Sequence, residues 1–352
     1  MKIRLVLEDG KVFEGEGFGK EGETIAEVVF NTSMTGYQEI CTDPSYNGQM
    51  VAMTYPLIGN YGFNDIYVES RKTFVEGFIV NEICDKPSNW NCSMDAQEYF
   101  FKNDIVGIKG VDTRALTQHI RSFGSMWGMI SNGEDDVDVL LGKIKEASEK
   151  RRNLVMEATT NTPIHIKGEG ERVVLLDFGA KKNIIRSLQK RDCDVYVLPA
   201  NSTFEDVLSY SPDGVLLSNG PGDPADLIDV IDQVKTMVGK IPLFGICLGH
   251  QLIGLALGGK TYKMKFGHHG ANHPVKDFAR DRCFITSQNH NYALENDFSK
   301  DIEVTHINVN DKSVEGFRHK KLPIMGVQYH PEACPGPEDS AYIFDDFIKL
   351  IG

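Results

Sequence analysis

The segment Gly245-Ile-Cys-Leu-Gly-His-Gln251 is the most informative part of the sequence, because it places one cysteine between two glycines where two apolar segments meet. Residues 241–246 are apolar enough for a buried parallel strand, and residues 248–257 have apolar side chains at helical spacing. Cys247 is therefore predicted on a sharp strand-to-helix turn, and the flanking glycines relieve its crowding. A helix N-terminus favours the reactive thiolate. A lone cysteine is more often a small core residue, but the two glycines favour a nucleophile here.

A base for this nucleophile is predicted downstream. Residues 324–330 form an apolar run that indicates a second buried strand, and His330 lies at its end with Glu332 two residues further on. Residues i and i+2 of an extended segment face the same way, so Glu332 can accept a hydrogen bond from one nitrogen of His330 while the other nitrogen faces the sulfur. Only folding can bring Cys247 and His330 together. The sequence thus predicts a Cys247–His330–Glu332 triad.

A glycine-rich loop can complete the site. Residues 213–218 are predicted as a strand that ends in Asn219-Gly-Pro-Gly-Asp-Pro224. Gly220 and Gly222 allow close backbone approach, and backbone N–H groups of this loop, with that of Leu248, could form an oxyanion hole. An ordinary tight turn between a strand and a helix is the alternative.

These motifs together resemble a class I glutamine amidotransferase domain. Further motifs along the whole chain are similar to the small, glutamine-hydrolysing subunit of carbamoyl phosphate synthetase. These are Phe30-Asn-Thr-Ser-Met-Thr-Gly-Tyr-Gln-Glu39, Thr42-Asp-Pro-Ser-Tyr46, Asp112-Thr-Arg114, Asp177-Phe-Gly-Ala-Lys181, Lys263-Met-Lys-Phe-Gly-His-His-Gly270 and Gln288-Asn-His290. The resemblance implies an α/β fold whose C-terminal part is an open, mostly parallel sheet flanked by helices, preceded by a mixed α/β N-terminal domain.

The resemblance also implies a reaction. Glutamine would be hydrolysed through a cysteinyl thioester, and the ammonia would pass to a large, ATP-dependent partner subunit that makes carbamoyl phosphate from bicarbonate for arginine and pyrimidine biosynthesis. The chain contains neither Gly-x-x-x-x-Gly-Lys-Ser/Thr nor, at its strand–helix junctions, Gly-x-Gly-x-x-Gly. We therefore expect no cofactor on this chain, and ATP with magnesium on the partner.

Glutamine contacts are transferred from the family motif by motif. They are Ser45, Gly220, Gly222, Leu248, Gln251, Asn289, Asn291 and Tyr292. The family usually has glycine and an aromatic residue at the last two positions, so Asn291 must tolerate the backbone dihedral that glycine would have had. If that backbone is left-handed, asparagine is the non-glycine residue best suited to it; the alternative is that the Asn291 side chain itself contacts glutamine. Cys334 is a second departure, because serine is usual there, and a small neutral substitution is the favoured interpretation.

Length and pattern predict two domains. A chain of 352 residues can bury two cores. Residues 1–150 are strand-rich and are expected to face the partner, residues 151–170 look like a linker, and residues 171–352 alternate strands and helices as in a parallel sheet with helices on both faces.

Charge and cysteine usage exclude several classes. A net charge of −13 argues against nucleic acid and anionic membranes as partners. The first ten residues resemble a hairpin and not a signal peptide, and no stretch is long enough to span a bilayer. The seven cysteines are scattered without a Cys-x-x-Cys pair, which favours a reducing cytoplasm. Five histidines could suggest a metal, but no cysteine ligands are near them, so no metal site is predicted; these are His250, His268, His269, His273 and His290.

Two alternatives stay open at this stage. An amidotransferase that supplies another acceptor, as in anthranilate, guanylate or cytidylate synthesis, would share residues 173–352 but leave residues 1–150 unexplained. A scaffold whose glutaminase has died is disfavoured by the presence of Cys247, His330 and Glu332, which a dead copy has no chemical need to keep.

Overall fold

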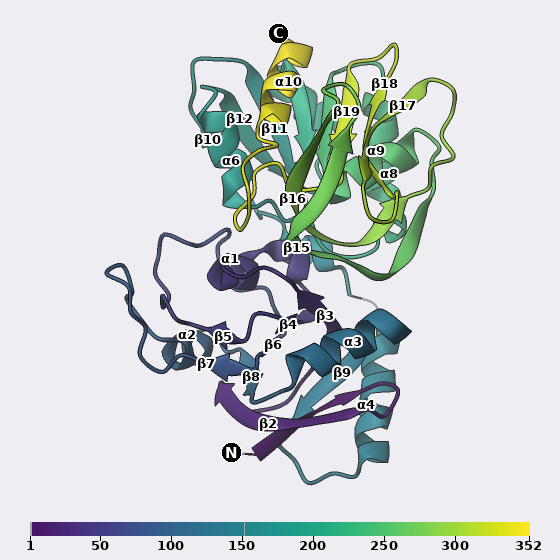
Figure 1. The fold of residues 1–352 in the computed structure, drawn as a ribbon. Helices are drawn as coiled ribbons and strands as arrows, with labels where there is room; N and C mark the ends of the chain where they lie inside the picture. Colours follow the sequence, from purple (N-terminus) through teal and green to yellow (C-terminus); the bar gives the residue numbers. More distant parts are fainter. Residues whose placement is uncertain (1, 151) are drawn as a thin grey trace. The chain divides into compact units, whose positions relative to one another are not determined.

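The computed structural model describes residues 2–150 and 152–352, which form two compact units, Met1–Asn153 and Leu154–Gly352. Each unit has its own hydrophobic core and is described by itself (Figure 1).

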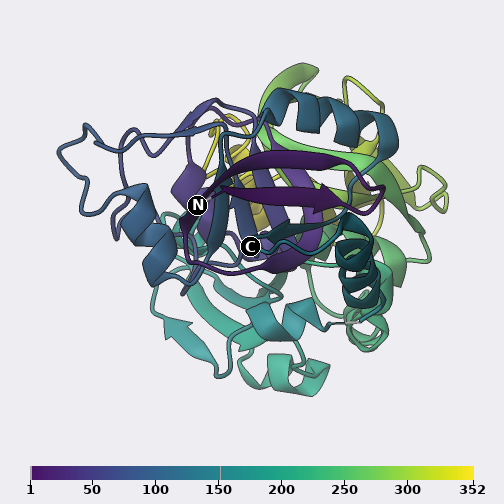
Figure 2. The same ribbon diagram turned by 90° about the horizontal axis from the view of Figure 1, so that it is seen from below.

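The N-terminal unit is built on a closed barrel with the strand order β1-β2-β8-β6-β4-β3-β9. Three neighbouring pairs, β8–β6, β6–β4 and β4–β3, are parallel, and the other pairs of the barrel are antiparallel. Figure 2 shows its first strands in purple. The elements are β1 (Lys2–Leu7), β2 (Val12–Gly19), β3 (Thr24–Asn31), α1 (Tyr37–Thr42), the 3-10 helix η1 (Pro44–Tyr46), β4 (Gln49–Met53), β5 (Leu57–Ile58), β6 (Gly77–Ile79), β7 (Glu82–Ile83), α2 (Ala96–Lys102), β8 (Val106–Lys109), α3 (Thr113–Phe123), β9 (Met126–Ser131) and α4 (Val137–Glu149).

Local sequence explains the helices of this unit. The side chains of Asp95 and Asp112 accept hydrogen bonds from the first turns of α2 and α3, as N-cap residues do. Helix α4 packs its apolar stripe, Leu140 and Ile144, against Val6 of the barrel. The mixed α/β character predicted for residues 1–150 thus takes the form of a barrel with short helices.

The C-terminal unit contains a sheet of strand order β10-β12-β11-β13-β14-β19-β18-β17-β15-β16. Its centre, from β12 to β19, is parallel, while β10 on one side and β18 to β16 on the other are antiparallel. The elements are α5 (Leu154–Ala158), β10 (Ile164–Ile166), β11 (Arg172–Asp177), α6 (Lys182–Gln189), β12 (Asp194–Pro199), α7 (Phe204–Ser209), β13 (Gly214–Leu217), η2 (Pro224–Asp226), α8 (Ile228–Met237), β14 (Leu243–Ile246), α9 (Leu248–Ala256), β15 (Thr261–Asp277), β16 (Arg282–Leu294), β17 (Ile302–Asn308), β18 (Val314–His319), β19 (Ile324–Val327) and α10 (Tyr342–Ile351).

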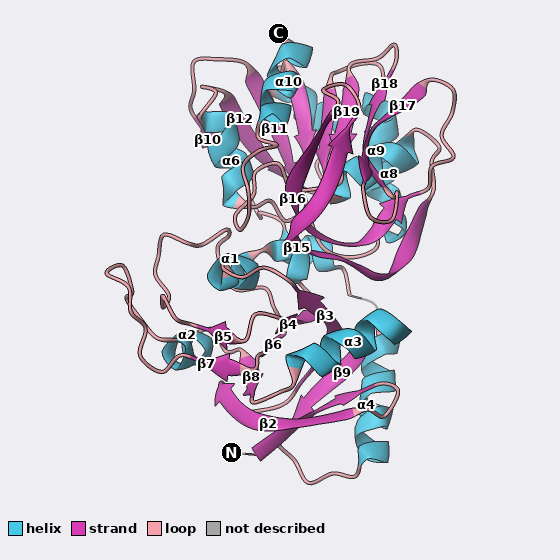
Figure 3. Ribbon diagram, in the orientation of Figure 1, coloured by secondary structure: helices cyan, strands magenta, loops and turns pink. Residues whose placement is uncertain are grey.

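Helices cover both faces of the parallel centre (Figure 3). Alternate residues of each strand belong to different cores: Leu217 packs with side chains of α7, α8 and α9, whereas Leu216 packs with those of α6 and α10. Because both faces are buried, the central strands are almost continuously apolar. None of the helices in the described parts of the chain is long and apolar enough to cross a membrane.

The segment predicted as a linker, residues 151–170, contains two short elements. Residue 151 lies outside the described residues, but α5 and β10 both fall within the segment. Strand β10 forms the edge of the sheet and pairs with β12, and His165 stacks on Tyr196 and contacts Asp194 at 2.7 Å. The edge of a sheet offers unpaired backbone groups, which explains why this polar stretch is ordered.

Candidate active site

Cys247 lies on a strained turn between β14 and α9. Its backbone angles are φ 52° and ψ −105°, a conformation that L-residues rarely adopt. A Cβ at Gly245 would lie 2.4 Å from the carbonyl carbon of Gly249, and one at Gly249 would lie 2.1 Å from the carbonyl oxygen of Leu217. Neither position can carry a side chain, so the two glycines permit the turn that the sequence predicted, and the sulfur is buried at its apex.

Strand β19 directs the predicted base to the same edge of the sheet. β14 and β19 are parallel neighbours, and the backbone N–H of Cys247 donates to Val327 at 2.9 Å. Three residues later, the N–H of His330 donates to the carbonyl of Ser287 on β16. The carbonyl of Asn289 on the same strand lies 3.6 Å from the sulfur of Cys247. One stretch of β16 thus lies against both Cys247 and His330.

His330 is oriented by a buried carboxylate. Its Nδ1 lies 2.7 Å from Oε1 of Glu332, as the i, i+2 argument predicted. Among the described residues, its Nε2 has no hydrogen-bond partner although it is buried. A histidine with one nitrogen fixed by a carboxylate and the other free for a reacting group has the geometry of a general base.

Lys181 is a further member of this group that the sequence analysis gave no role. Its Nζ lies 2.9 Å from Oε1 of Glu332 and also donates to the carbonyls of Ala333 and Cys334, at 2.5 and 3.3 Å. Burial, the largest single influence, raises the pKa of Glu332, but the positive charge of Lys181 and the contact with His330 outweigh it and lower the pKa to about 2. Glu332 therefore stays ionised at any physiological pH and keeps the Nδ1 proton on His330.

Two of the residues predicted to hold glutamine, Gln251 and Tyr292, lie at the same edge. Gln251, on the first turns of α9, donates to the carbonyl of Tyr292 at 2.7 Å and to Oε1 of Gln328 at 2.9 Å. Nε2 of Gln328 in turn lies 3.6 Å from the sulfur of Cys247. These contacts join Gln251 and Tyr292 to the nucleophile.

The expectation of a left-handed backbone at Asn291 is wrong. Asn291 lies within strand β16 and is not among the residues of positive φ. Its Oδ1 lies 2.8 Å from Nε2 of His269, while Nδ1 of the same histidine lies 3.0 Å from Oδ1 of Asn289. His269 therefore fixes two predicted glutamine contacts at once, and the amide of Asn291, not its backbone, is the distinctive feature.

The remaining predicted residues divide into those near the turn and those elsewhere. Gly220 lies against the start of α9, since a Cβ there would be 2.8 Å from Cδ2 of Leu248. Gly222 has φ 92° and faces Leu154, and no contact between it and the triad is described. Ser45 belongs to the N-terminal unit, on η1, where its N–H donates to the side chain of Asp43. Its role as a glutamine contact stays a prediction.

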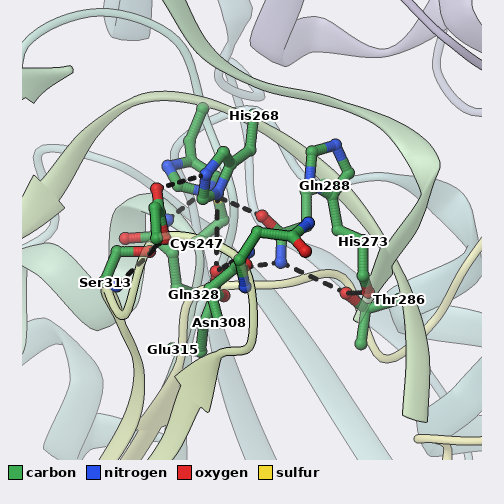
Figure 4. Close-up of polar contacts among 12 residues, drawn as sticks. Cys247, His268, His273, Thr286, Gln288, Asn308, Ser313, Glu315 and Gln328 are labelled. Carbon is green, nitrogen blue, oxygen red and sulfur yellow. Dashed lines mark hydrogen bonds and ion pairs between the residues drawn. The ribbon is translucent and has the colours of Figure 1, made fainter. Parts of the chain in front are cut away.

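A second histidine cluster lies further along β15 and β16 (Figure 4). His268 lies between two carboxylates, with Nε2 2.9 Å from Asp311 and Nδ1 3.5 Å from Glu315. Burial lowers the pKa of His268, but the hydrogen bond to Asp311 and the nearby carboxylate of Glu315 outweigh it and raise the pKa to about 9. Ligand atoms of His268, His290 and Glu315 lie within 4.8 Å of one another. A metal would have to displace the proton of His268, so the expectation of no metal site stays in place as a prediction.

Sequence reasoning missed Lys181, Gln328 and His269. Lys181 lies in the loop that follows β11, and Gln328 comes directly after β19, so both follow buried parallel strands, as Cys247 does. Polar residues at the carboxyl ends of parallel strands tend to meet at one edge, and this signal pointed to the place of Lys181 and Gln328 but not to their partners. His269 lies inside the antiparallel strand β15, where no such signal exists.

Comparisons with known proteins agree with this geometry. Residues 174–350 match the family model "Glutamine amidotransferase class-I", and residues 5–130 match "Carbamoyl-phosphate synthase small chain, CPSase domain". The carbamoyl phosphate synthase pyrimidine-specific small chain of Bacillus subtilis is 52% identical over 351 residues, covering 100% of this chain and 96% of its own length. The carbamoyl phosphate synthase small chain of Bacillus caldolyticus is 53% identical over 353 residues, covering 100% of this chain and 97% of its own length.

These matches also account for the part of the chain that other amidotransferases leave unexplained, because the second family model covers most of the N-terminal barrel. A class I amidotransferase unit with a cysteine elbow and a histidine–carboxylate pair thus follows a small-chain-specific unit in one polypeptide. The chain therefore belongs to the family of carbamoyl phosphate synthase small chains.

Proposed function

We propose that this chain is the glutaminase subunit of a carbamoyl phosphate synthase. The observation that supports it most directly is the buried thiol of Cys247 on a strained elbow, at the same sheet edge as a histidine whose Nδ1 is held by Glu332. This is the arrangement that nucleophilic attack on an amide requires.

The proposed reaction begins with the proton of Cys247 passing to Nε2 of His330. The sulfur attacks the side-chain amide carbon of glutamine, and the carbonyl electrons move to oxygen. When the tetrahedral adduct collapses, His330 returns the proton to the departing nitrogen and the C–N bond breaks. Ammonia is released, and the acyl group remains bound to Cys247 as a thioester. His330 then removes a proton from water, which attacks the thioester, and glutamate and the free thiol are released. Neither thioester formation nor thioester hydrolysis needs an oxidant or a metal.

The negative oxygen of each adduct needs hydrogen-bond donors. The backbone N–H of Leu248, directly after the nucleophile, and N–H groups of the loop around Gly220 are the proposed donors. Gly220 and Leu248 are close enough for a Cβ on the glycine to clash with the leucine side chain, which supports a shared site.

The ammonia is proposed to pass to a large partner subunit. In neutral water ammonia is mostly protonated and no longer nucleophilic, so a synthase gains from a sheltered transfer. The partner would bind ATP with magnesium and bicarbonate and form carbamoyl phosphate, while this chain binds glutamine and no cofactor. The product would serve arginine and pyrimidine biosynthesis in the cytoplasm, the compartment where seven cysteines without a disulfide are usual.

The test is to replace the nucleophile in the assembled complex. Cys247→Ser should abolish glutamine-dependent carbamoyl phosphate formation, while synthesis from added ammonium should persist. Cys193→Ser is a matched control, because Cys193 is also a buried thiol of this unit, whose pKa burial raises to about 11, and it should leave glutamine use intact. Glutamine-dependent synthesis that survives in the Cys247 variant would overturn the proposal.

A further inference from the structure

Gln328 lies between the nucleophile and the predicted glutamine contacts, and neither the family motifs nor the triad gives it a role. It is completely buried, directly after β19. Its backbone N–H donates to the carbonyl of Glu315 at 2.9 Å, so the position of its main chain does not depend on its side chain. Figure 4 shows Gln328 in the polar cluster that also contains Cys247, and its Nε2 lies 3.6 Å from the sulfur.

The orientation of this amide follows from its neighbours. Gln251 donates from Nε2 both to the backbone carbonyl of Tyr292 and to Oε1 of Gln328. A backbone carbonyl can only accept, so Gln251 must direct its N–H groups toward it. Oε1 of Gln328 must then face Gln251, and Nε2 of Gln328 must face the sulfur of Cys247, at 3.6 Å.

Two contacts of the sulfur, with Asn289 and with Gln328, favour opposite protonation states. The carbonyl of Asn289, at 3.6 Å, can accept from the thiol but repels the thiolate. The N–H of Gln328 can donate to the thiolate, and a hydrogen bond to a charged group is stronger than one to a neutral group. Proton transfer to His330 therefore exchanges one partner for the other.

We propose that Gln328 is a further residue of the active site, whose amide N–H stabilises the Cys247 thiolate and whose orientation is fixed by Gln251 and the carbonyl of Tyr292. The inference rests on the proposed thiol chemistry. It adds a link between substrate binding and activation of the nucleophile, because any movement of Gln251 on binding glutamine changes the partner that holds the amide of Gln328.

The test compares Gln328→Met, which keeps the volume but removes the donor, with Gln328→Glu, which keeps an acceptor for Gln251 but presents oxygen to the sulfur. The full chain is alkylated with iodoacetamide across a pH series, and the Cys247 peptide is quantified by mass spectrometry. Both variants should shift the reactivity of Cys247 to higher pH, by about one unit or more, and lower kcat/KM for glutamine by about tenfold to a hundredfold.

Gln288→Met is the matched control. Gln288 is also buried and bonds to Thr286 and Glu315 in the same polar cluster, but no contact with Cys247 is described for it. Its alkylation profile should match that of the wild type. A Gln328→Met or Gln328→Glu profile that overlays the wild type, or an equal shift in Gln288→Met, would overturn the inference. A wild-type Cys247 that resists alkylation at neutral pH would instead contradict the proposed thiol chemistry.

Discussion

Two buried histidines of the C-terminal unit have carboxylate neighbours, yet their surroundings suit them to opposite tasks. His330 contacts Glu332 through Nδ1, and its Nε2 is free of hydrogen bonds within the described chain. His268 faces Asp311 with one nitrogen and Glu315 with the other. The first can accept a proton and return it, whereas the second is held as a cation.

The difference lies in how the carboxylates are balanced. The charge of Glu332 is already neutralised by Lys181 at 2.9 Å, so the carboxylate orients His330 without needing the histidine to be charged. The cluster of Asp311 and Glu315 has no such buried lysine among its described contacts, and the proton on His268 supplies the positive charge. A histidine–carboxylate pair therefore indicates a general base only when the other partners of both the histidine and the carboxylate are taken into account.

The largest expected effect comes from removing the base. His330→Asn should lower kcat for glutamine hydrolysis roughly a thousandfold or more, because proton transfer in both half-reactions is lost. Glu332→Gln should be about tenfold to a hundredfold less damaging, since the orienting group acts through the base. Single-turnover glutaminase assays measure these losses of rate, and urea unfolding checks that each variant is folded. Equal losses in the two variants, or a larger loss in Glu332→Gln, would contradict the assigned roles.

Replacing the charged histidine should alter stability and its pH dependence. The pKa of His268 is raised from 6.5 to about 9 in the folded chain, so its contribution is fully present below about pH 6.5 and is lost as the pH rises through 9. We expect the free energy of unfolding to fall by on the order of 2 kcal/mol over this interval, and this fall to be absent in His268→Gln. Urea unfolding at pH 6 and pH 9 tests this. Parallel pH dependence in both proteins would show that His268 is not held as a cation.

The smallest effect is expected at Asn291. Since this residue lies in a strand, valine is compatible with its backbone, and both Asn291→Gly and Asn291→Val lose the same contact with His269. Both should raise the KM for glutamine by a similar factor, roughly threefold to tenfold, as expected for one neutral hydrogen bond. Steady-state kinetics of the two variants side by side decide it. A severe loss of glutaminase activity in Asn291→Val but not in Asn291→Gly would show instead that the backbone conformation at this position matters.

Predictability from sequence was greatest where one short segment determines both backbone and chemistry. The glycines around Cys247 predicted its turn, and the i, i+2 spacing predicted the contact of His330 with Glu332, because both are local. Lys181 could not be assigned, since its partner is Glu332, far along the chain and brought near only by the parallel order of β11, β13, β14 and β19. Asn291 was misjudged because the family's glycine suggested a backbone constraint, whereas a β-strand and a contact across two strands decide its environment.

The contact between Gly249 and the carbonyl oxygen of Leu217 has a consequence for how this site can vary. A single added methyl group at Gly249 would lie 2.1 Å from that oxygen, and β13, which ends there, leads directly into the loop of Gly220. The close approach of Gly249 to Leu217 therefore fixes the position of the nucleophile relative to its proposed oxyanion donors, and no larger residue fits at Gly249. A substitution at Gly249 would displace Cys247 relative to the proposed oxyanion donors while every reactive side chain is still present. The presence of all three triad residues in a sequence is therefore not sufficient for glutaminase activity.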